Sequence, residues 1–190
     1  MVGQQSDEEL MLAYGDGDLE AFEIIYRRHS GGLFRYLLRQ CGNASDAEEL
    51  FQDVWANLIR ARERYEVQAK FSTYLYRLAH NRVIDHYRRR AHNPSDKAVN
   101  PSADDEGPDD LPQDGILNIE DHVHLRRLAA RLLELLDRLP PMQREAFLLR
   151  EEGGFSVEEI AKVMGVNPET AKSRLRYAVA KLRRGLIDDR

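Results

Sequence analysis

The sequence predicts an all-α protein in which two small helical domains are joined by a flexible acidic linker. Three observations predict this class. Apolar residues recur at the three- to four-residue spacing of amphipathic helices, and no segment has the pattern of a convincing strand. Residues 93–121 lack this periodicity and contain nine acidic residues against one lysine. Near the end of the chain, two helix-start signals flank a glycine, which predicts a helix-turn-helix in the second domain.

The composition is that of a globular protein, with 42% hydrophobic and 32% charged residues among 190. No run of about 18 apolar residues occurs, so we expect no membrane insertion. The polar and acidic start lacks the basic and apolar regions of a secretory signal. The single cysteine, Cys41, cannot form an internal disulfide, and no cysteine pair suits a metal. These features predict a cytoplasmic protein without a metal or cofactor.

The net charge of −5 is unevenly distributed along the chain. Residues 1–92 carry a net charge of −1, residues 93–121 one of −8, and residues 122–190 one of +4. The acidity therefore lies mostly in the linker. About thirty extended residues span up to about 100 Å, against roughly 70 Å for two turns of DNA. Two modules joined in this way can contact one DNA molecule at a distance.

Two helices are predicted in the first forty residues. Ser6 and Glu9 form a capping box, which opens a short helix that stops near residues 15–17. Asp18 then caps a longer helix that continues to Gly42. Adjacent glycines at 31–32 either bend or break this second helix, and the sequence does not decide between the two.

A third helix begins at the cap Ser45 and runs to about Arg64. Trp55 and Ile59 lie off one edge of its inward apolar stripe, beside polar residues. An apolar edge mixed with polar groups is typical of a partner-binding surface. The alternative is that Trp55 packs under a neighbouring helix.

Residues 65–70 have no periodicity and predict a loop, after which a helix resumes from Phe71 to Arg90. This helix combines aromatic residues with arginines and an asparagine, in Tyr74, Tyr76, Arg77, Asn81, Arg82, Tyr87 and Arg88–Arg90. Rings stack on exposed bases, arginines hold phosphates, and an amide reads a base edge, so the pattern suits single-stranded nucleic acid. The alternative is an ordinary amphipathic helix with tyrosines in its core.

The second module is predicted to have four helices. The first starts near Glu120 and ends before the two prolines at 140–141, and the next covers residues 142–150. The last two form the helix-turn-helix, whose first helix is opened by a capping box of Ser156 and Glu159. Gly165 allows the left-handed turn, after which Asn167 is an N-cap and Pro168 suits the first helical position.

The final helix carries a basic outward face. At about 100° per residue, an inward stripe is formed by Ala171, Leu175, Ala178, Val179 and Leu182. Between residues 168 and 184 there are six basic residues against one acid, Glu169. Basic side chains with a serine and a tyrosine near the helix start suit contacts with base edges and phosphates. The alternative is a solvated basic helix on an ordinary bundle.

No catalytic site is assembled in the sequence. The chain has no glycine-rich phosphate loop and no Gly-x-Ser-x-Gly elbow. Its six histidines are scattered, and the abundant carboxylates mostly serve as helix caps or linker charge. We therefore expect a protein that is not an enzyme.

The order of these parts resembles that of a known family. The matching segments are 46–55 (DAEELFQDVW), 71–81 (FSTYLYRLAHN), 139–145 (LPPMQRE) and the helix-turn-helix. They are similar to bacterial RNA polymerase sigma factors of the extracytoplasmic-function (ECF) group of the sigma-70 superfamily, which keep only domains 2 and 4. The resemblance covers about residues 8–91 and 120–186. It implies domain 2 at 1–91, a linker at 92–119 and domain 4 at 120–190.

The resemblance also implies three sets of contact residues. Docking on the clamp helices of the largest subunit of core RNA polymerase would involve Asp46, Glu49, Gln52, Asp53, Trp55 and Arg60. The loop at 65–70 would help to capture the −10 strand, together with Phe71, Tyr74, Arg77, Asn81, Arg82 and Arg88. Asn81 would read an extruded base. The −35 duplex would be contacted by Thr170, Lys172, Ser173, Arg174, Arg176 and Tyr177.

Two hypotheses about function follow. The first is a sigma factor in transcription initiation, which binds core RNA polymerase and promoter DNA, both duplex and single-stranded, and helps to melt it. An anti-sigma factor is then an expected partner. The second is a free-standing helix-turn-helix regulator that binds duplex operators. The first module discriminates between them, because such a regulator needs a dimerisation or ligand domain there.

Overall fold

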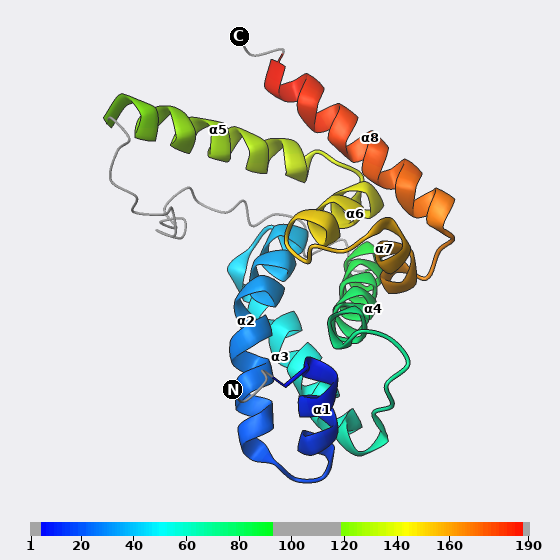
Figure 1. The fold of residues 1–190 in the computed structure, drawn as a ribbon. Coiled ribbons are helices and arrows are strands. Elements are labelled where there is room, and N and C mark those ends of the chain that lie inside the picture. Colours follow the sequence, from blue (N-terminus) through cyan, green and yellow to red (C-terminus); the bar gives the residue numbers. More distant parts are fainter. Residues whose placement is uncertain (1–4, 93–118, 188–190) are drawn as a thin grey trace.

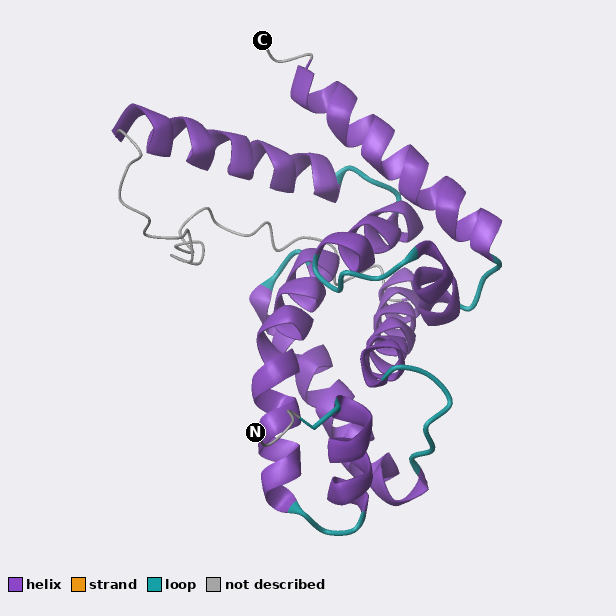
Figure 2. Ribbon diagram, in the orientation of Figure 1, coloured by secondary structure: helices purple, strands orange, loops and turns teal. Residues whose placement is uncertain are grey.

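The computed structural model describes residues 5–92 and 119–187, with side chains described for residues 5–91 and 125–187. Within these ranges the structure contains α-helices, one short 3₁₀ helix and no strand (Figure 2). The elements are α1 (Asp7–Gly15), α2 (Leu19–Cys41), α3 (Ala44–Ala61), η1 (Arg62–Arg64), α4 (Phe71–His92), α5 (Ile119–Asp137), α6 (Pro141–Glu151), α7 (Val157–Met164) and α8 (Pro168–Ile187). The all-α prediction is confirmed. The predicted linker lies outside the described residues, apart from its two helical ends.

The first two helices start where the sequence predicts. The amide of Ser6 donates to Glu9 Oε2 at 2.9 Å, and the amide of Glu9 donates to Ser6 Oγ at 3.2 Å. Asp18 accepts from the amides of residues 20 and 21. α2 continues without a break through residues 31–32 and ends at Cys41, followed by the C-cap Gly42, which has a φ of 75°. The glycines therefore do not interrupt this helix.

The start predicted for the third helix is wrong by two residues. Asn43, not Ser45, is the N-cap of α3, because its side chain accepts the amide of Asp46 at 2.9 Å. Asn43 has the extended backbone that an N-cap requires, whereas Ser45 already lies within the helix. The α-helix ends at Ala61, and η1 then leads into the loop.

Helices α1 to α4 form the first module, in which α2, α3 and α4 pack against one another (Figure 1). Its core is made of fully buried side chains from these helices, namely Ile25, Leu33, Leu37, Leu50, Val54, Leu58, Phe71 and Leu75. In the second module, α6 and α7 pack on the inner side of α8, and α5 packs against α8 as well. Buried residues here include Leu136, Ala146, Leu148, Leu149, Ile160, Val163, Ala171 and Ala178.

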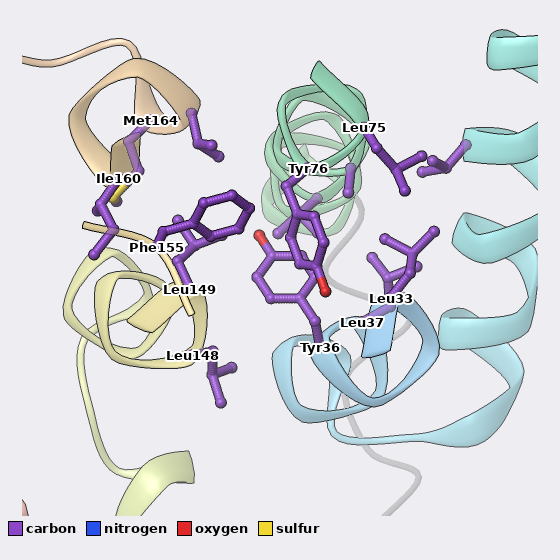
Figure 3. Packing of buried hydrophobic residues seen from close by; sticks show 14 of the residues in the cluster. Leu33, Tyr36, Leu37, Leu75, Tyr76, Leu148, Leu149, Phe155, Ile160 and Met164 are labelled. Atoms are coloured by element: carbon purple, nitrogen blue, oxygen red, sulfur yellow. The ribbon is translucent and has the colours of Figure 1, made fainter. Parts of the chain in front are cut away.

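The two modules also pack on each other, a contact that the sequence did not predict. α7 lies against α4, and α6 lies against α2. Figure 3 shows Phe155 facing Tyr76, with Tyr36 beside Tyr76. The ring centres are 5.0 Å apart for Tyr76 and Phe155, and 5.2 Å apart for Tyr36 and Tyr76. Aromatic edge-to-face packing therefore joins the modules through their cores.

A buried carboxylate lies at the centre of this contact. Glu145 on α6 is 1% exposed, and its Oε1 accepts from the Tyr36 hydroxyl at 2.9 Å and lies 2.5 Å from His80 Nδ1. Burial, together with the charge of Glu145, raises the pKa of Tyr36 well above its ordinary value. The phenol therefore remains a hydrogen-bond donor at neutral pH.

Three further ion pairs cross the same boundary. Glu152 accepts from Arg35 at 3.1 Å and also pairs with Arg39. Lys70 Nζ lies 2.8 Å from Glu159 Oε1, and this partner raises the pKa of Lys70. Basic groups of the first module thus meet acidic groups of the second.

Candidate nucleic-acid interface

The predicted helix-turn-helix is present as α7, a tight turn and α8. Ser156 and Glu159 form the expected capping box, with distances of 2.8 and 3.2 Å. Gly165 has a φ of 63°, the left-handed conformation predicted for it. Asn167 Oδ1 accepts the amide of Thr170 at 2.7 Å, and Pro168 is the first residue of α8. Each signal that defines this unit is local, and the structure confirms each one.

The outer side of α8 presents the basic face that the sequence predicts. Ala171 and Ala178 are fully buried, while Lys172, Arg176 and Tyr177 are exposed. Thr170, Ser173 and Arg174 are half-buried beside them. The Arg176 guanidinium carbon lies 5.2 Å from the centre of the Tyr177 ring, and Lys172 is 3.8 Å from Glu169. An exposed cation stacked on an aromatic ring can contact both a phosphate and a base edge.

A second polar stripe runs along α4. Tyr74, Arg77, Asn81 and Arg88 fall within about 60° of one another at about 100° per residue. Arg77 and Asn81 are exposed, and Tyr74 is half-buried. Asp85 lies 3.2 Å from Arg82 and 4.0 Å from Arg88. The predicted −10 residues thus largely share one side of the helix.

Phe71 is the exception, because its side chain is fully buried. Its ring centre lies 6.3 Å from that of Tyr65 and 6.5 Å from that of Tyr74. Phe71, which the resemblance groups with the −10 contact residues, therefore lies in the core beneath the surface of α4. The residue supports the neighbouring rings from below instead of facing a ligand.

A pocket of about 340 Å³ opens between the loop at 65–70, the start of α4 and α7. Its lining residues are Arg64, Tyr65, Glu66, Gln68, Ala69, Thr73, Tyr74, Arg77 and Lys162. The ring centres of Tyr65 and Tyr74 are 5.2 Å apart. Burial raises the pKa of Tyr65 to about 12 and that of Tyr74 above its ordinary value, so both stay neutral phenols. Aromatic walls with three cations suit a base and its phosphates.

The pocket includes residues that sequence reasoning missed. Asn81, the predicted base reader, does not line the pocket, whereas Gln68 and Thr73 do. Gln68 could have been suggested by its place in the predicted loop, since an amide can pair with a base edge. Lys162 could not have been found, because it belongs to the second module and only the packing of α7 on α4 brings it here.

The predicted polymerase-binding residues divide into two groups on α3. Asp46 lies 3.4 Å from His86 Nε2 and pairs with Arg90 at 3.3 Å, and Glu49 lies 3.7 Å from Arg89, so both acids face the end of α4. Apart from Trp55, the others lie on the outer part of α3, where Gln52 and Arg60 are exposed and Asp53 is half-buried.

Trp55 is not part of an exposed edge. Its side chain is 5% exposed, with ring-centre distances of 5.8 Å to Phe22, 4.8 Å to Tyr26 and 6.1 Å to Phe51. The interpretation of an exposed tryptophan is wrong, and the alternative of packing under a neighbouring helix holds. Ile59, one turn further, is 36% exposed and keeps an apolar group at the surface.

Within the part of the chain that the structure describes, no group of histidine, cysteine and acidic side chains could hold a metal ion. None of the described helices is long and apolar enough to cross a membrane.

Family models match both modules. Residues 25–93 match sigma-70 region 2, and residues 129–182 match sigma-70 region 4. The RNA polymerase sigma factor CarQ of Myxococcus xanthus is 33% identical over 178 residues, which are 91% of this chain and 93% of that one. The ECF RNA polymerase sigma factor SigE of Mycolicibacterium smegmatis is 32% identical, over 95% of this chain and 69% of that one.

Two solved structures have the same fold. One is CnrH in complex with the cytosolic domain of CnrY, with a TM-score of 0.68 and 22% identity, covering 98% of this chain and 100% of that one. The other is the sigma factor RpoE in complex with the anti-sigma factor NepR from Bartonella quintana, with a TM-score of 0.67 and 22% identity. It covers 90% of this chain and 100% of that one.

The fold, the basic face of α8 and the two family matches together define a protein of transcription initiation. The chain belongs to the sigma-70 family of RNA polymerase sigma factors, in its ECF group. It therefore binds core RNA polymerase and promoters, and sigma factors are not enzymes. The match to region 2 covers the module in which a free-standing regulator would need a dimerisation or ligand domain, so the second hypothesis is set aside.

Proposed function

We propose that this sigma factor reads promoters through two surfaces of different kinds. The outer face of α8 binds the −35 element as duplex, and the pocket beside α4 captures the −10 strand as the duplex opens. The observation that carries the proposal is the pairing of a flat basic helix face with a separate aromatic pocket. A duplex presents edges and phosphates to a helix, whereas an extruded base needs a hollow with stacking walls.

The −35 contact is assigned to the first half of α8. This helix has 20 residues and is about 30 Å long, which suits an element lying in the major groove. The six residues proposed for the contact are Thr170, Lys172, Ser173, Arg174, Arg176 and Tyr177. Arg176 is the proposed base reader, since an exposed guanidinium can bind a guanine edge at two atoms.

The −10 contact is assigned to the pocket and to the stripe that leads out of it along α4. Tyr65 and Tyr74 would stack on a base, and Arg64 and Arg77 would hold its phosphates. Asn81, Arg82 and Arg88 would continue the path for the strand along α4, and Phe71 would act from the core. Stacking in the pocket offsets an unpairing cost of a few kcal/mol, which favours melting.

Docking on the clamp helices of core polymerase is assigned to α3. Glu49, Gln52, Asp53 and Arg60 would make the contacts, while Asp46 and the buried Trp55 would hold the helix in place. The sequence division into domain 2 (1–91), linker (92–119) and domain 4 (120–190) is part of the same proposal. So are a cytoplasmic location and control by an anti-sigma factor; the solved relative RpoE is in complex with the anti-sigma factor NepR.

The proposal is tested by run-off transcription with purified core polymerase on a pool of genomic fragments. The wild-type chain should add discrete transcripts, whose start sites give promoters for the later measurements. Arg176→Ala should weaken promoter binding by roughly 1–3 kcal/mol. Lys181→Ala, on the same helix but more than three turns from its start, is the matched control for lost charge. Equal promoter selectivity in both variants would exclude Arg176 from base reading.

The pocket is tested by comparing intact and pre-melted templates. Tyr74→Ala and Gln68→Ala should slow opening of the intact promoter more than they weaken binding to a pre-melted one. Asn81→Ala separates the two candidate base readers, because Asn81 lies outside the pocket and Gln68 inside it. If only Asn81→Ala slows opening, the base is read on the open face of α4 and the pocket has another role.

A further inference from the structure

Helix α4 begins without a capping side chain of its own. Lys70 holds the N-cap position, since its carbonyl accepts the amide of Tyr74 at 3.2 Å. A lysine ammonium only donates, so it cannot accept the free amides at a helix start. The first turn of α4 also lacks an acidic residue that would interact with the helix dipole.

The missing acceptor comes from the other end of the module. The amide of Phe71, the first residue of α4, donates to Glu8 Oε1 on α1 at 2.6 Å. This bond joins positions 63 residues apart in the sequence and is partly buried. A charged acceptor at a helix N-terminus both satisfies an amide and interacts favourably with the dipole.

Glu8 is held in place by its neighbours on α1. Ser6 and Glu9 fix the start of the helix through their capping box. Asp7 lies 2.6 Å from Arg28 Nη1 and 2.7 Å from His29 Nε2, which fastens α1 to α2. The consecutive acids Asp7 and Glu8 therefore hold two different helices, α2 and α4. α1 therefore connects α2 and α4 through side-chain contacts.

The same carboxylate lies next to the pocket. Burial raises the pKa of Tyr65, and the negative charge of Glu8 raises it further. Tyr65 forms one wall of the pocket, and Phe71, whose amide Glu8 holds, packs beneath both Tyr65 and Tyr74. Loss of this carboxylate would free the start of α4 at the point where the loop meets it.

We propose that Glu8 is a positioning residue for strand capture: it caps α4 from α1 and thereby fixes the relative places of the loop, Tyr65 and Tyr74. Glu8 itself contacts no nucleic acid. This inference rests on the proposed role of the pocket at the −10 element, and it adds a determinant outside both regions that the family models match.

The first experiment compares Glu8→Ala with Glu9→Ala in holoenzyme. Both remove one acid from α1, but the Glu9 carboxylate caps α1 itself, whereas that of Glu8 accepts the first amide of α4. On an intact promoter Glu8→Ala should slow opening about fivefold, the factor expected for one lost helix cap. On a pre-melted template of the same sequence, where no base pair has to open, the deficit of Glu8→Ala relative to Glu9→Ala should be smaller. The thermal unfolding midpoints of both variants are measured in parallel, so that a difference in opening rate can be separated from a difference in overall stability.

Restoring a cap to α4 by a second substitution distinguishes the loss of this cap from a general loss of stability. In the Glu8→Ala background, Lys70→Ser supplies a local N-cap and should restore most of the opening rate. Lys70→Ala provides no acceptor and should restore nothing. Both changes remove the Lys70–Glu159 ion pair, so they are matched in that respect.

Equal opening rates for Glu8→Ala and Glu9→Ala would overturn the positioning role, as would equal behaviour of Lys70→Ser and Lys70→Ala. A different result would show that the pocket does not capture the −10 strand. In that case Tyr74→Ala and Gln68→Ala would open the intact promoter at the wild-type rate, and the pocket would lose its role whatever Glu8→Ala does.

Discussion

The two helices that face nucleic acid begin in opposite ways. α8 starts at its own cap, Asn167, whose side chain accepts an amide three residues later. α4 starts at Lys70 and takes its acceptor from Glu8, 63 residues earlier. A helix that reads duplex DNA can be a locally specified unit laid on a core. A pocket that captures a base must be assembled from several parts of the chain.

Burial shows the same contrast. The residues proposed to contact the −35 element lie on the open side of one helix, above the buried small residues Ala171 and Ala178. The pocket beside α4 instead draws on η1, the loop, α4 and α7, with Phe71 completely buried beneath it. Substitutions under the pocket should therefore affect stability and function together, whereas those on α8 should separate the two.

The largest effect is expected for Phe71→Ala. Truncation of this fully buried ring should lower the free energy of unfolding by about 3–5 kcal/mol, because it leaves a cavity beneath Tyr65 and Tyr74. Urea unfolding measures the loss. Tyr177→Ala, which truncates a 52%-exposed ring on α8, is the control and should change stability by less than about 0.5 kcal/mol. Similar losses of unfolding free energy in the two variants would contradict the proposed difference between the pocket and the face of α8.

A smaller effect is expected where the modules meet. Glu152→Arg places a third cation beside Arg35 and Arg39 and should cost about 1–2 kcal/mol of stability, between the values of exposed and buried ion pairs. Glu151→Arg makes the same charge change at an exposed neighbour and should cost little. Adding Arg39→Glu to Glu152→Arg should recover part of the loss. An absence of recovery would mean that packing, not charge, holds this part of the contact.

Removal of the local cap of α8 should cost about 1 kcal/mol. Asn167→Ala leaves the amide of Thr170 without its acceptor at the start of the recognition helix. We expect weaker binding of −35 duplex and an unchanged rate of strand capture on a pre-melted template. Fluorescence anisotropy with the two DNA forms measures both. A matching loss on the pre-melted form would show that the two surfaces are coupled.

The smallest effect depends on pH. Burial raises the pKa of Asp7, but hydrogen bonds from Arg28 and His29 outweigh burial and leave the pKa below its ordinary value of 3.8. A lowered pKa in the folded state means that Asp7 stabilises the fold above pH 3.8 and that this contribution disappears as the pH falls through the lower folded value. The stability difference between wild type and Asp7→Asn should therefore shrink in acid. Denaturant titrations from about pH 6 to pH 2.5 measure it; a constant difference would exclude the linkage.

The features that could be predicted from sequence are those decided within a few residues. Periodicity gave the helices, and side chains at fixed offsets gave both capping boxes, the Gly165 turn and the Asn167 cap. The basic face of α8 follows from the same spacing. The error at Ser45 arose because two good capping residues lie two positions apart, and only backbone geometry selects Asn43.

What could not be predicted depends on contacts between distant segments. Trp55 has the same neighbours in sequence whether it is exposed or packed against Phe22 and Tyr26, and only the position of α2 decides. Nothing near Lys70 indicates that its helix is capped by Glu8. The entry of Lys162 into the pocket and the burial of Glu145 both require the two modules to meet, and the linker sequence allows them to stay apart.

The buried carboxylate between the modules has a consequence for how the molecule unfolds. Separation of the modules would expose Glu145 and remove the acceptor of the Tyr36 hydroxyl, while Tyr76 and Phe155 would lose each other's rings. Each module thus buries side chains of the other. Heating should then give one cooperative transition, with equal calorimetric and van't Hoff enthalpies, although the chain has two sigma regions.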